Sequence, residues 1–138
     1  MTEPTRTAPL EGLHLLLIED SVEMVTNLAA FFRSHGARLV ESQPSALRAQ
    51  KRLQSPPAPD IVLLDFKLNG SMTGTDLAVW MRSQPHLEHV LRVSFSAVTR
   101  ERALRGAPDE GVYHAMIQKP VRLATLTAKL AELAKQRR

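Results

Sequence analysis

Four consecutive aliphatic residues stand between two carboxylates in the run Asp60-Ile61-Val62-Leu63-Leu64-Asp65. A half-solvated strand would alternate apolar and polar residues, so this run is typical of a short strand buried on both faces of a parallel sheet. In open α/β sheets the ligand crevice lies just beyond the carboxyl ends of the strands, where Asp65 stands. Taken alone, Asp65 is better interpreted as an acidic strand end that starts a turn. Its function therefore depends on the residues that accompany it.

The same succession of a short strand and a helix is expected five times along the chain. The predicted strands are residues 14–18, 37–41, 60–65, 90–95 and 112–117, and the predicted helices are 22–35, 45–54, 75–83, 99–104 and 122–136. This alternation favours one α/β domain with a parallel sheet, right-handed crossovers and helices on both faces. Residues 1–12 are expected to form a flexible lead-in, and residues 13–138 the domain.

The composition excludes several classes of protein. The chain has no cysteine, which excludes disulfides, thiolate metal sites and cysteine nucleophiles. No apolar run approaches the roughly 18 residues of a membrane span. The N-terminus lacks the apolar core of a signal peptide, so we expect a cytoplasmic protein. Because the chain ends after the fifth helix, we also expect a stand-alone domain without an output domain.

The chain is basic, with a formal net charge of +4 and a pI of about 10.0. The 18 basic residues are spread along the sequence, with the densest groups at residues 100–105 and 135–138. Only four Phe, one Trp and one Tyr are available to stack on bases. Direct nucleic-acid binding is therefore not expected, and an acidic protein partner or a solvated basic face is favoured.

Polar side chains with complementary chemistry follow four of the predicted strands. Glu19 and Asp20 follow the first strand, Asp65 ends the third, Ser96 follows the fourth and Lys119 follows the fifth. Because the carboxyl ends of parallel strands share one edge of the sheet, these side chains are expected to converge on one cleft.

This group of residues suits phosphoryl transfer. Neighbouring carboxylates repel one another, so either one of them stays protonated or a cation binds. Carboxylate oxygens suit Mg²⁺, and Asp65 can accept a phosphoryl group to give an acyl phosphate. The Lys119 ammonium would then pair with phosphoryl oxygens as a point charge, and the Ser96 hydroxyl could donate a hydrogen bond to one of them.

With these residues, and with Pro120 after Lys119, the sequence resembles the receiver domain of two-component response regulators over roughly residues 13–136. The resemblance implies a flavodoxin-like (βα)5 fold with strand order 2-1-3-4-5. It implies that Asp65 takes a phosphoryl group from a phosphohistidine on a sensor histidine kinase or phosphotransfer protein. It also implies a Mg²⁺ site formed by Glu19, Asp20, Asp65 and the backbone carbonyl of Lys67.

The resemblance further assigns a switch and an output surface. Ser96 matches the hydroxyl that moves on activation, Met116 stands where an aromatic partner is common, and Pro120 matches a cis-proline position. The implied output is contact with a downstream protein partner, or a homodimer through the fourth helix, fifth strand and fifth helix. The resemblance implies a phosphoacceptor with self-catalysed transfer and dephosphorylation at most, and not an enzyme in the usual sense.

Some residues depart from the family pattern and keep alternatives open. Asn69 replaces a common proline, Gly74 comes one residue late, Met116 replaces the aromatic, and Lys67 adds a second ammonium. These departures motivate an alternative, a receiver-like interaction module that works without phosphorylation. A dehalogenase-type phosphohydrolase would need a second carboxylate where Lys67 stands. Dinucleotide binding would need a Gly-x-Gly-x-x-Gly motif after the first strand, and that motif is absent.

Overall fold

The computed structural model describes residues 8–137 and contains one five-stranded parallel sheet with the order β2-β1-β3-β4-β5. The strands are β1 (His14–Ile18), β2 (Leu39–Gln43), β3 (Ile61–Leu64), β4 (Leu91–Ser96) and β5 (Ala115–Gln118). The predicted parallel α/β architecture and the strand order 2-1-3-4-5 are both confirmed.

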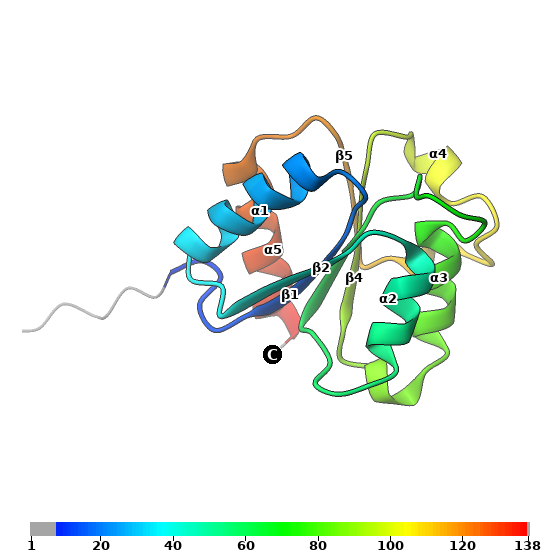
Figure 1. Ribbon diagram of the computed structural model, residues 1–138, viewed down its shortest axis with the longest axis horizontal. Coiled ribbons are helices and arrows are strands. Elements are labelled where there is room, and N and C mark those ends of the chain that lie inside the picture. Colours follow the sequence, from blue (N-terminus) through cyan, green and yellow to red (C-terminus); the bar gives the residue numbers. More distant parts are fainter. Residues whose placement is uncertain (1–7, 138) are drawn as a thin grey trace, which may run out of the picture.

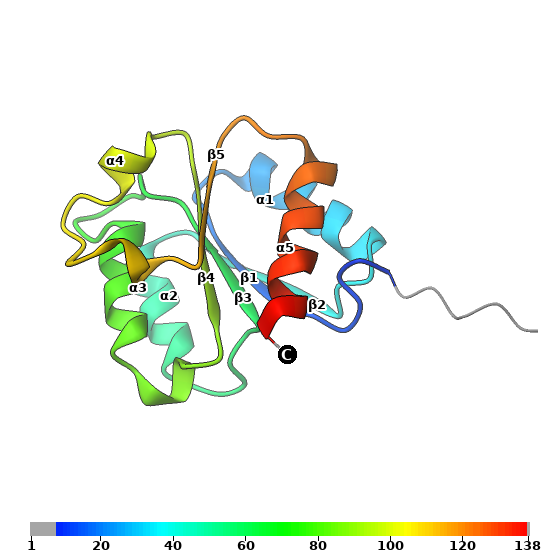
Figure 2. The same ribbon diagram turned by 180° about the vertical axis from the view of Figure 1, so that it is seen from behind.

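Helices cover both faces of the sheet (Figures 1 and 2). One face packs against α1 (Val22–Ser34) and α5 (Leu123–Arg137), and the other against α2 (Ala46–Leu53) and α3 (Gly74–Arg82). The buried strands contribute side chains to the core on both faces of the sheet. In β1, Leu15 and Leu17 belong to the cluster with α1 and α5, and Leu16 and Ile18 belong to the cluster with α2 and α3. No helix of residues 8–137 combines the length and apolar character needed to cross a membrane.

The segment before β1 belongs to the packed structure. Leu10 is fully buried in the core beside α1 and α5, and its N–H donates a hydrogen bond of 2.9 Å to the His35 carbonyl. The prediction of a flexible lead-in is therefore wrong for residues 8–12. The part of that prediction concerning residues 1–7 lies outside the described residues.

The predicted strand 112–117 is wrong in its first half. Residues Glu110–Val112 form a 3₁₀ turn, which Asp109 caps by accepting a 2.8 Å hydrogen bond from the Gly111 N–H. The Val112 carbonyl accepts a hydrogen bond from the Arg92 guanidinium at 2.7 Å. β5 consequently begins only at Ala115. β2 also begins two residues later than predicted, because the Ala37 N–H still bonds to α1 at the Phe32 carbonyl.

Candidate functional site at the carboxyl ends of the strands

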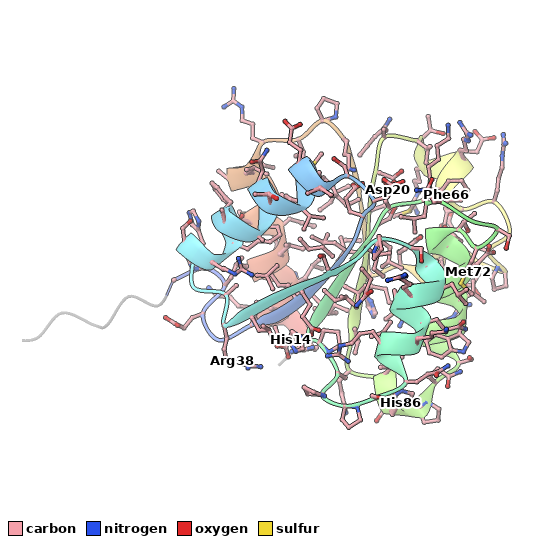
Figure 3. All side chains as sticks on the ribbon, viewed as in Figure 1. His14, Asp20, Arg38, Phe66, Met72 and His86 are labelled. Atoms are coloured by element: carbon pink, nitrogen blue, oxygen red, sulfur yellow. The ribbon has the colours of Figure 1, made fainter. Side chains whose placement is uncertain are left out.

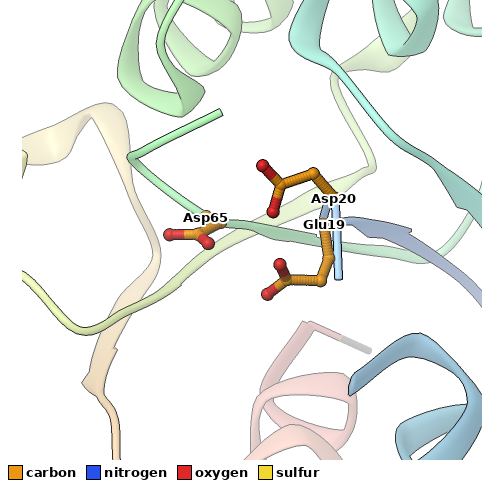
Figure 4. A group of neighbouring side chains, drawn as sticks. All are labelled: Glu19, Asp20 and Asp65. Carbon is orange, nitrogen blue, oxygen red and sulfur yellow. The ribbon is translucent and has the colours of Figure 1, made fainter. Parts of the chain in front are cut away.

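The three predicted acidic residues meet at one edge of the sheet (Figure 4). β1 and β3 are neighbours, and their register pairs Ile18 with Leu64, so the next residues, Glu19 and Asp65, leave the sheet side by side. Carboxylate oxygens of Glu19, Asp20 and Asp65 lie within 4.8 Å of one another. Figure 3 shows Asp20 and Phe66 at this end of the molecule, with His14 and His86 at the opposite end.

The turn into α1 sets the two acidic residues after β1 at different depths. The Ser21 hydroxyl caps α1 by accepting a hydrogen bond from the Met24 N–H, and the Ser21 N–H donates to Glu19 at 3.1 Å. Glu19 is thereby held inward and is only 8% exposed, whereas Asp20 is exposed at the rim. The capping residue thus fixes which carboxylate faces solvent.

Lys119 connects the far edge of the sheet to the acidic group. Its ammonium lies 2.6 Å from Glu19 Oε1 and 3.6 Å from Asp65 Oδ2, and 5.0 Å from the centre of the Phe95 ring. The Lys119 N–H donates to the Ser96 carbonyl at 2.8 Å, which fixes the backbone next to β4. The following Lys119–Pro120 peptide bond is cis. The residues expected to converge are therefore close together.

Glu19 and Asp65 differ in how readily they ionise. Burial raises the pKa of Asp65 above its ordinary value, although Lys119, the Ser96 hydroxyl and the Lys67 N–H partly oppose this. Burial also opposes ionisation of Glu19, but hydrogen bonds from Lys119 and the Ser21 N–H outweigh it, so the pKa of Glu19 is lowered. In this arrangement Glu19 is the main ionic partner of Lys119.

The two residues predicted to act as a switch line one cavity. Ser96 is buried at the end of β4, and its hydroxyl accepts a hydrogen bond from the Val98 N–H at 3.3 Å. Met116 pairs with Ser94 in the ladder between β4 and β5. Ser96, Met116 and Arg100 line a cavity of about 120 Å³. Movement of Ser96 and Met116 on activation stays a prediction.

The loop after Asp65 contributes backbone rather than side chains. Lys67 is exposed, and only its N–H acts on Asp65. Its carbonyl as a metal ligand stays a prediction.

Gly74, whose spacing from Asp65 departs from the family pattern by one residue, is the first residue of α3. A Cβ atom added there would overlap the Asp65 carbonyl oxygen and lie 2.9 Å from the carbonyl carbon. Its own N–H donates to the Phe66 carbonyl at 3.2 Å. The backbone at the start of α3 thus packs directly on the backbone of Asp65.

Comparison with known proteins identifies this arrangement. The profile of the response regulator receiver domain matches residues 15–131, most of the chain. The chain belongs to this family. Receiver domains are phosphoacceptors of two-component systems. No curated protein sequence matches the chain at a significant level.

Solved structures share the fold at low sequence identity. A signal receiver domain of a signal transduction histidine kinase from Syntrophus aciditrophicus is 21% identical, with a TM-score of 0.79, and the match covers 91% of this chain and 92% of that one. A CheY-like receiver domain protein from Methanospirillum hungatei is 18% identical, with a TM-score of 0.80, covering 92% and 97%. The phosphorylated cyanobacterial phytochrome response regulator RcpA is 18% identical, with a TM-score of 0.72, covering 90% and 92%.

Receiver domains typically bind Mg²⁺ at an acidic pocket, and the residues of this receiver domain fit that ion. Within residues 8–137, the Lys119 ammonium is the cation paired with the three carboxylates, so negative charge is in excess at the site. Their oxygens are hard ligands of the kind Mg²⁺ prefers, and the exposed Asp20 leaves room for the waters that Mg²⁺ retains.

Proposed function

We propose that this receiver domain accepts a phosphoryl group on Asp65 from a phosphohistidine of a sensor histidine kinase or phosphotransfer protein, with Mg²⁺ as cofactor. The observation that carries the proposal is the position of the Lys119 ammonium, 2.6 Å from Glu19 and 3.6 Å from Asp65. From this position the Lys119 ammonium can exchange its contact with Glu19 for one with the phosphoryl oxygens on Asp65 while it stays in the site. The alternative without phosphorylation is not favoured, because every charged member of the site is retained.

In the proposed transfer, a carboxylate oxygen of Asp65 attacks the phosphorus in line with the bond to the imidazole nitrogen. The P–O bond of the acyl phosphate forms as the P–N bond breaks, and the imidazole leaves with the electron pair and takes up a proton. Such a transfer depends on positioning and charge neutralisation more than on covalent assistance. Mg²⁺ held by Glu19, Asp20, Asp65 and the Lys67 carbonyl would neutralise charge on the phosphoryl oxygens.

The protein's own residues would then respond to the added charge. Lys119 exchanges its contact with Glu19 for the phosphoryl group, since an ammonium binds phosphate oxygens as a point charge. The Ser96 hydroxyl, which already acts on Asp65, donates to a phosphoryl oxygen. We propose that the output is contact with a downstream protein, or a homodimer, through α4 (Arg100–Ala103), β5 and α5, and that the protein works in the cytoplasm.

Labelling of Asp65 by a small phosphodonor tests the proposal. The protein is incubated with acetyl phosphate and Mg²⁺, and intact mass and peptide mapping follow the added phosphoryl group. We expect labelling that needs Mg²⁺ and is lost in Asp65→Asn. Asp109→Asn is the matched control, because this exposed aspartate pairs with Arg82 away from the site. Labelling that persists in Asp65→Asn, or none in the wild type, would contradict the proposal.

A further inference from the structure

Two buried hydroxyl groups link the segment before β5 to α3 and α4. The Tyr113 hydroxyl and Thr75 Oγ1 lie 2.8 Å apart, and Thr75 Oγ1 donates a hydrogen bond to the Ala103 carbonyl. Tyr113 precedes β5, Thr75 belongs to the first turn of α3, and Ala103 ends α4 (Arg100–Ala103). Both side chains are buried, Tyr113 at 6% and Thr75 at 0% exposure. Water therefore does not compete for these bonds.

The direction of the two hydrogen bonds follows from the number of protons. A threonine hydroxyl has one proton, and Thr75 gives it to the Ala103 carbonyl. Tyr113 must then donate to Thr75. Burial raises the pKa of Tyr113 to about 12, so the phenol keeps its proton at neutral pH. The chain runs from Tyr113 through Thr75 to α4, and loss of any hydroxyl breaks it.

Thr75 directly follows Gly74, the residue that packs against the backbone of Asp65. Gly74 touches the backbone of Asp65 so closely that a methyl group would not fit between them. A shift of Asp65 therefore displaces the start of α3, and Thr75 moves with it. α4 lies beside this end of α3 in both ribbon views (Figures 1 and 2). The Thr75 hydroxyl then donates to the Ala103 carbonyl at the end of the single turn of α4.

We propose that Thr75 and Tyr113 couple the state of Asp65 to the position of α4. This inference rests on the proposed phosphorylation of Asp65 and names the residues that would carry its effect to the surface. Met116 also reaches α4, since its thioether sulfur accepts a hydrogen bond from the Arg100 guanidinium at 3.3 Å, but this contact is exposed and the acceptor is weak, so we assign the buried link to Thr75 and Tyr113. Tyr113 and Thr75 are positioning residues and do not touch the phosphoryl group.

Amide hydrogen exchange of α4, with and without Mg²⁺ and beryllofluoride, tests the coupling. The informative amides are those of Ala103 and Leu104, which bond to the Thr99 and Arg100 carbonyls and so report whether the turn is closed. In the wild type we expect beryllofluoride to change their exchange rates by about fivefold, the equivalent of one buried hydrogen bond. Thr75→Val and Tyr113→Phe should lose this response while still binding beryllofluoride.

Two further variants separate coupling from structure. Thr75→Ser keeps a hydroxyl and should keep the response. Thr127→Val removes a buried hydroxyl of α5 that has no hydrogen-bond partner among the described residues, so it should behave like the wild type. Because Tyr113 is the only tyrosine, a labelled tyrosine ring gives a second readout by NMR, and its signal should shift on beryllofluoride addition in wild type but not in Thr75→Val.

The outcomes distinguish the two proposals. If the wild type binds beryllofluoride and α4 responds equally in Thr75→Val and Tyr113→Phe, the coupling is wrong and the proposed phosphorylation stands. An α4 that shows no response in the wild type also overturns the coupling. If the wild type does not bind beryllofluoride, the proposed function fails and the coupling fails with it.

Discussion

Glu19 and Asp65 are both carboxylates within reach of Lys119, yet their environments differ. Glu19 accepts hydrogen bonds from the Lys119 ammonium at 2.6 Å and from the Ser21 N–H. Asp65 lies 3.6 Å from the same ammonium. The pKa of Glu19 is accordingly lowered and that of Asp65 is raised by burial. The charged form of Asp65 therefore costs the folded protein free energy, which gives a test by pH.

Asp65→Asn is expected to raise the free energy of unfolding at neutral pH. Since the folded-state pKa of Asp65 is raised, the folded protein holds this proton more tightly than the unfolded chain, whose carboxyl titrates near 3.8. Stability falls as the pH rises from that value through the folded-state pKa. The gain on substitution is at most about 1 kcal/mol, because solvent at the open rim screens the charge.

Urea unfolding of both proteins in the presence of a chelator measures this difference. It should be largest at neutral pH and should vanish below pH 3.8, where the carboxyl is protonated in both states. A variant that is less stable than the wild type at neutral pH would show that the carboxylate of Asp65 stabilises the fold.

Lys119→Gln should slow phosphorylation of Asp65. The substitution removes the cation that lies between Glu19 and Asp65 and leaves both carboxylates facing the incoming phosphoryl group. Because the variant loses one hydrogen bond to a charged group, the labelling rate should fall roughly 10- to 100-fold. The rate of acetyl phosphate labelling measures the effect, and Lys129→Gln on the exposed side of α5 is the control. An unchanged rate in Lys119→Gln would exclude this role.

Among the elements near the site, α3 has side-chain caps at its first turn. Its capping box joins Thr73 and Asp76, each side chain accepting the other's backbone N–H. Thr73→Ala should lower the free energy of unfolding by about 1 kcal/mol, the usual cost of a lost N-cap. Chemical denaturation measures the free energy of unfolding, with Thr125→Ala at an exposed position of α5 as the control. Equal stability of the two variants would show that packing alone fixes the start of α3.

The sequence predicted the elements well where local pattern and tertiary structure agree. Runs of four consecutive aliphatic residues identified β1 and β3, and the Ser21 and Thr99 caps lie where helix starts were predicted. The prediction of a strand at the apolar pair Val112 and Tyr113 is wrong, because these residues reach the core from the end of a 3₁₀ turn and not from a strand of the sheet. Such burial depends on contacts distant in sequence, which periodicity does not report.

The same distinction applies to the site. Residues that follow strands could be placed from topology alone, since parallel strands share one edge. The contact of Lys119 with Glu19 and the hydrogen bond between Thr75 and Tyr113 could not be predicted in this way. Both depend on side-chain rotamers, and the paired residues are 100 and 38 positions apart in the sequence, respectively.

At the scale of the whole molecule, residues 8–12 close the core beside α1 and α5. Leu10→Ala should lower the free energy of unfolding by about 2–5 kcal/mol, because it leaves a cavity in a fully buried position. Leu47→Ala, at a leucine of α2 that is 56% exposed, is the control and should cost far less. Thermal or urea unfolding measures both. Similar small losses in the two variants would show that the N-terminal segment adds little to the core.

The close packing of Gly74 on Asp65 has a consequence for the tolerance of the chain to mutation. In a saturation library selected for acetyl phosphate labelling, position 74 should return glycine alone, since any Cβ there meets the phosphoacceptor backbone. Gly70 has a positive φ of 103° but open space around it, so asparagine should survive there. Two glycines four residues apart would thus give opposite results, one constrained by its neighbours and the other only by its own backbone.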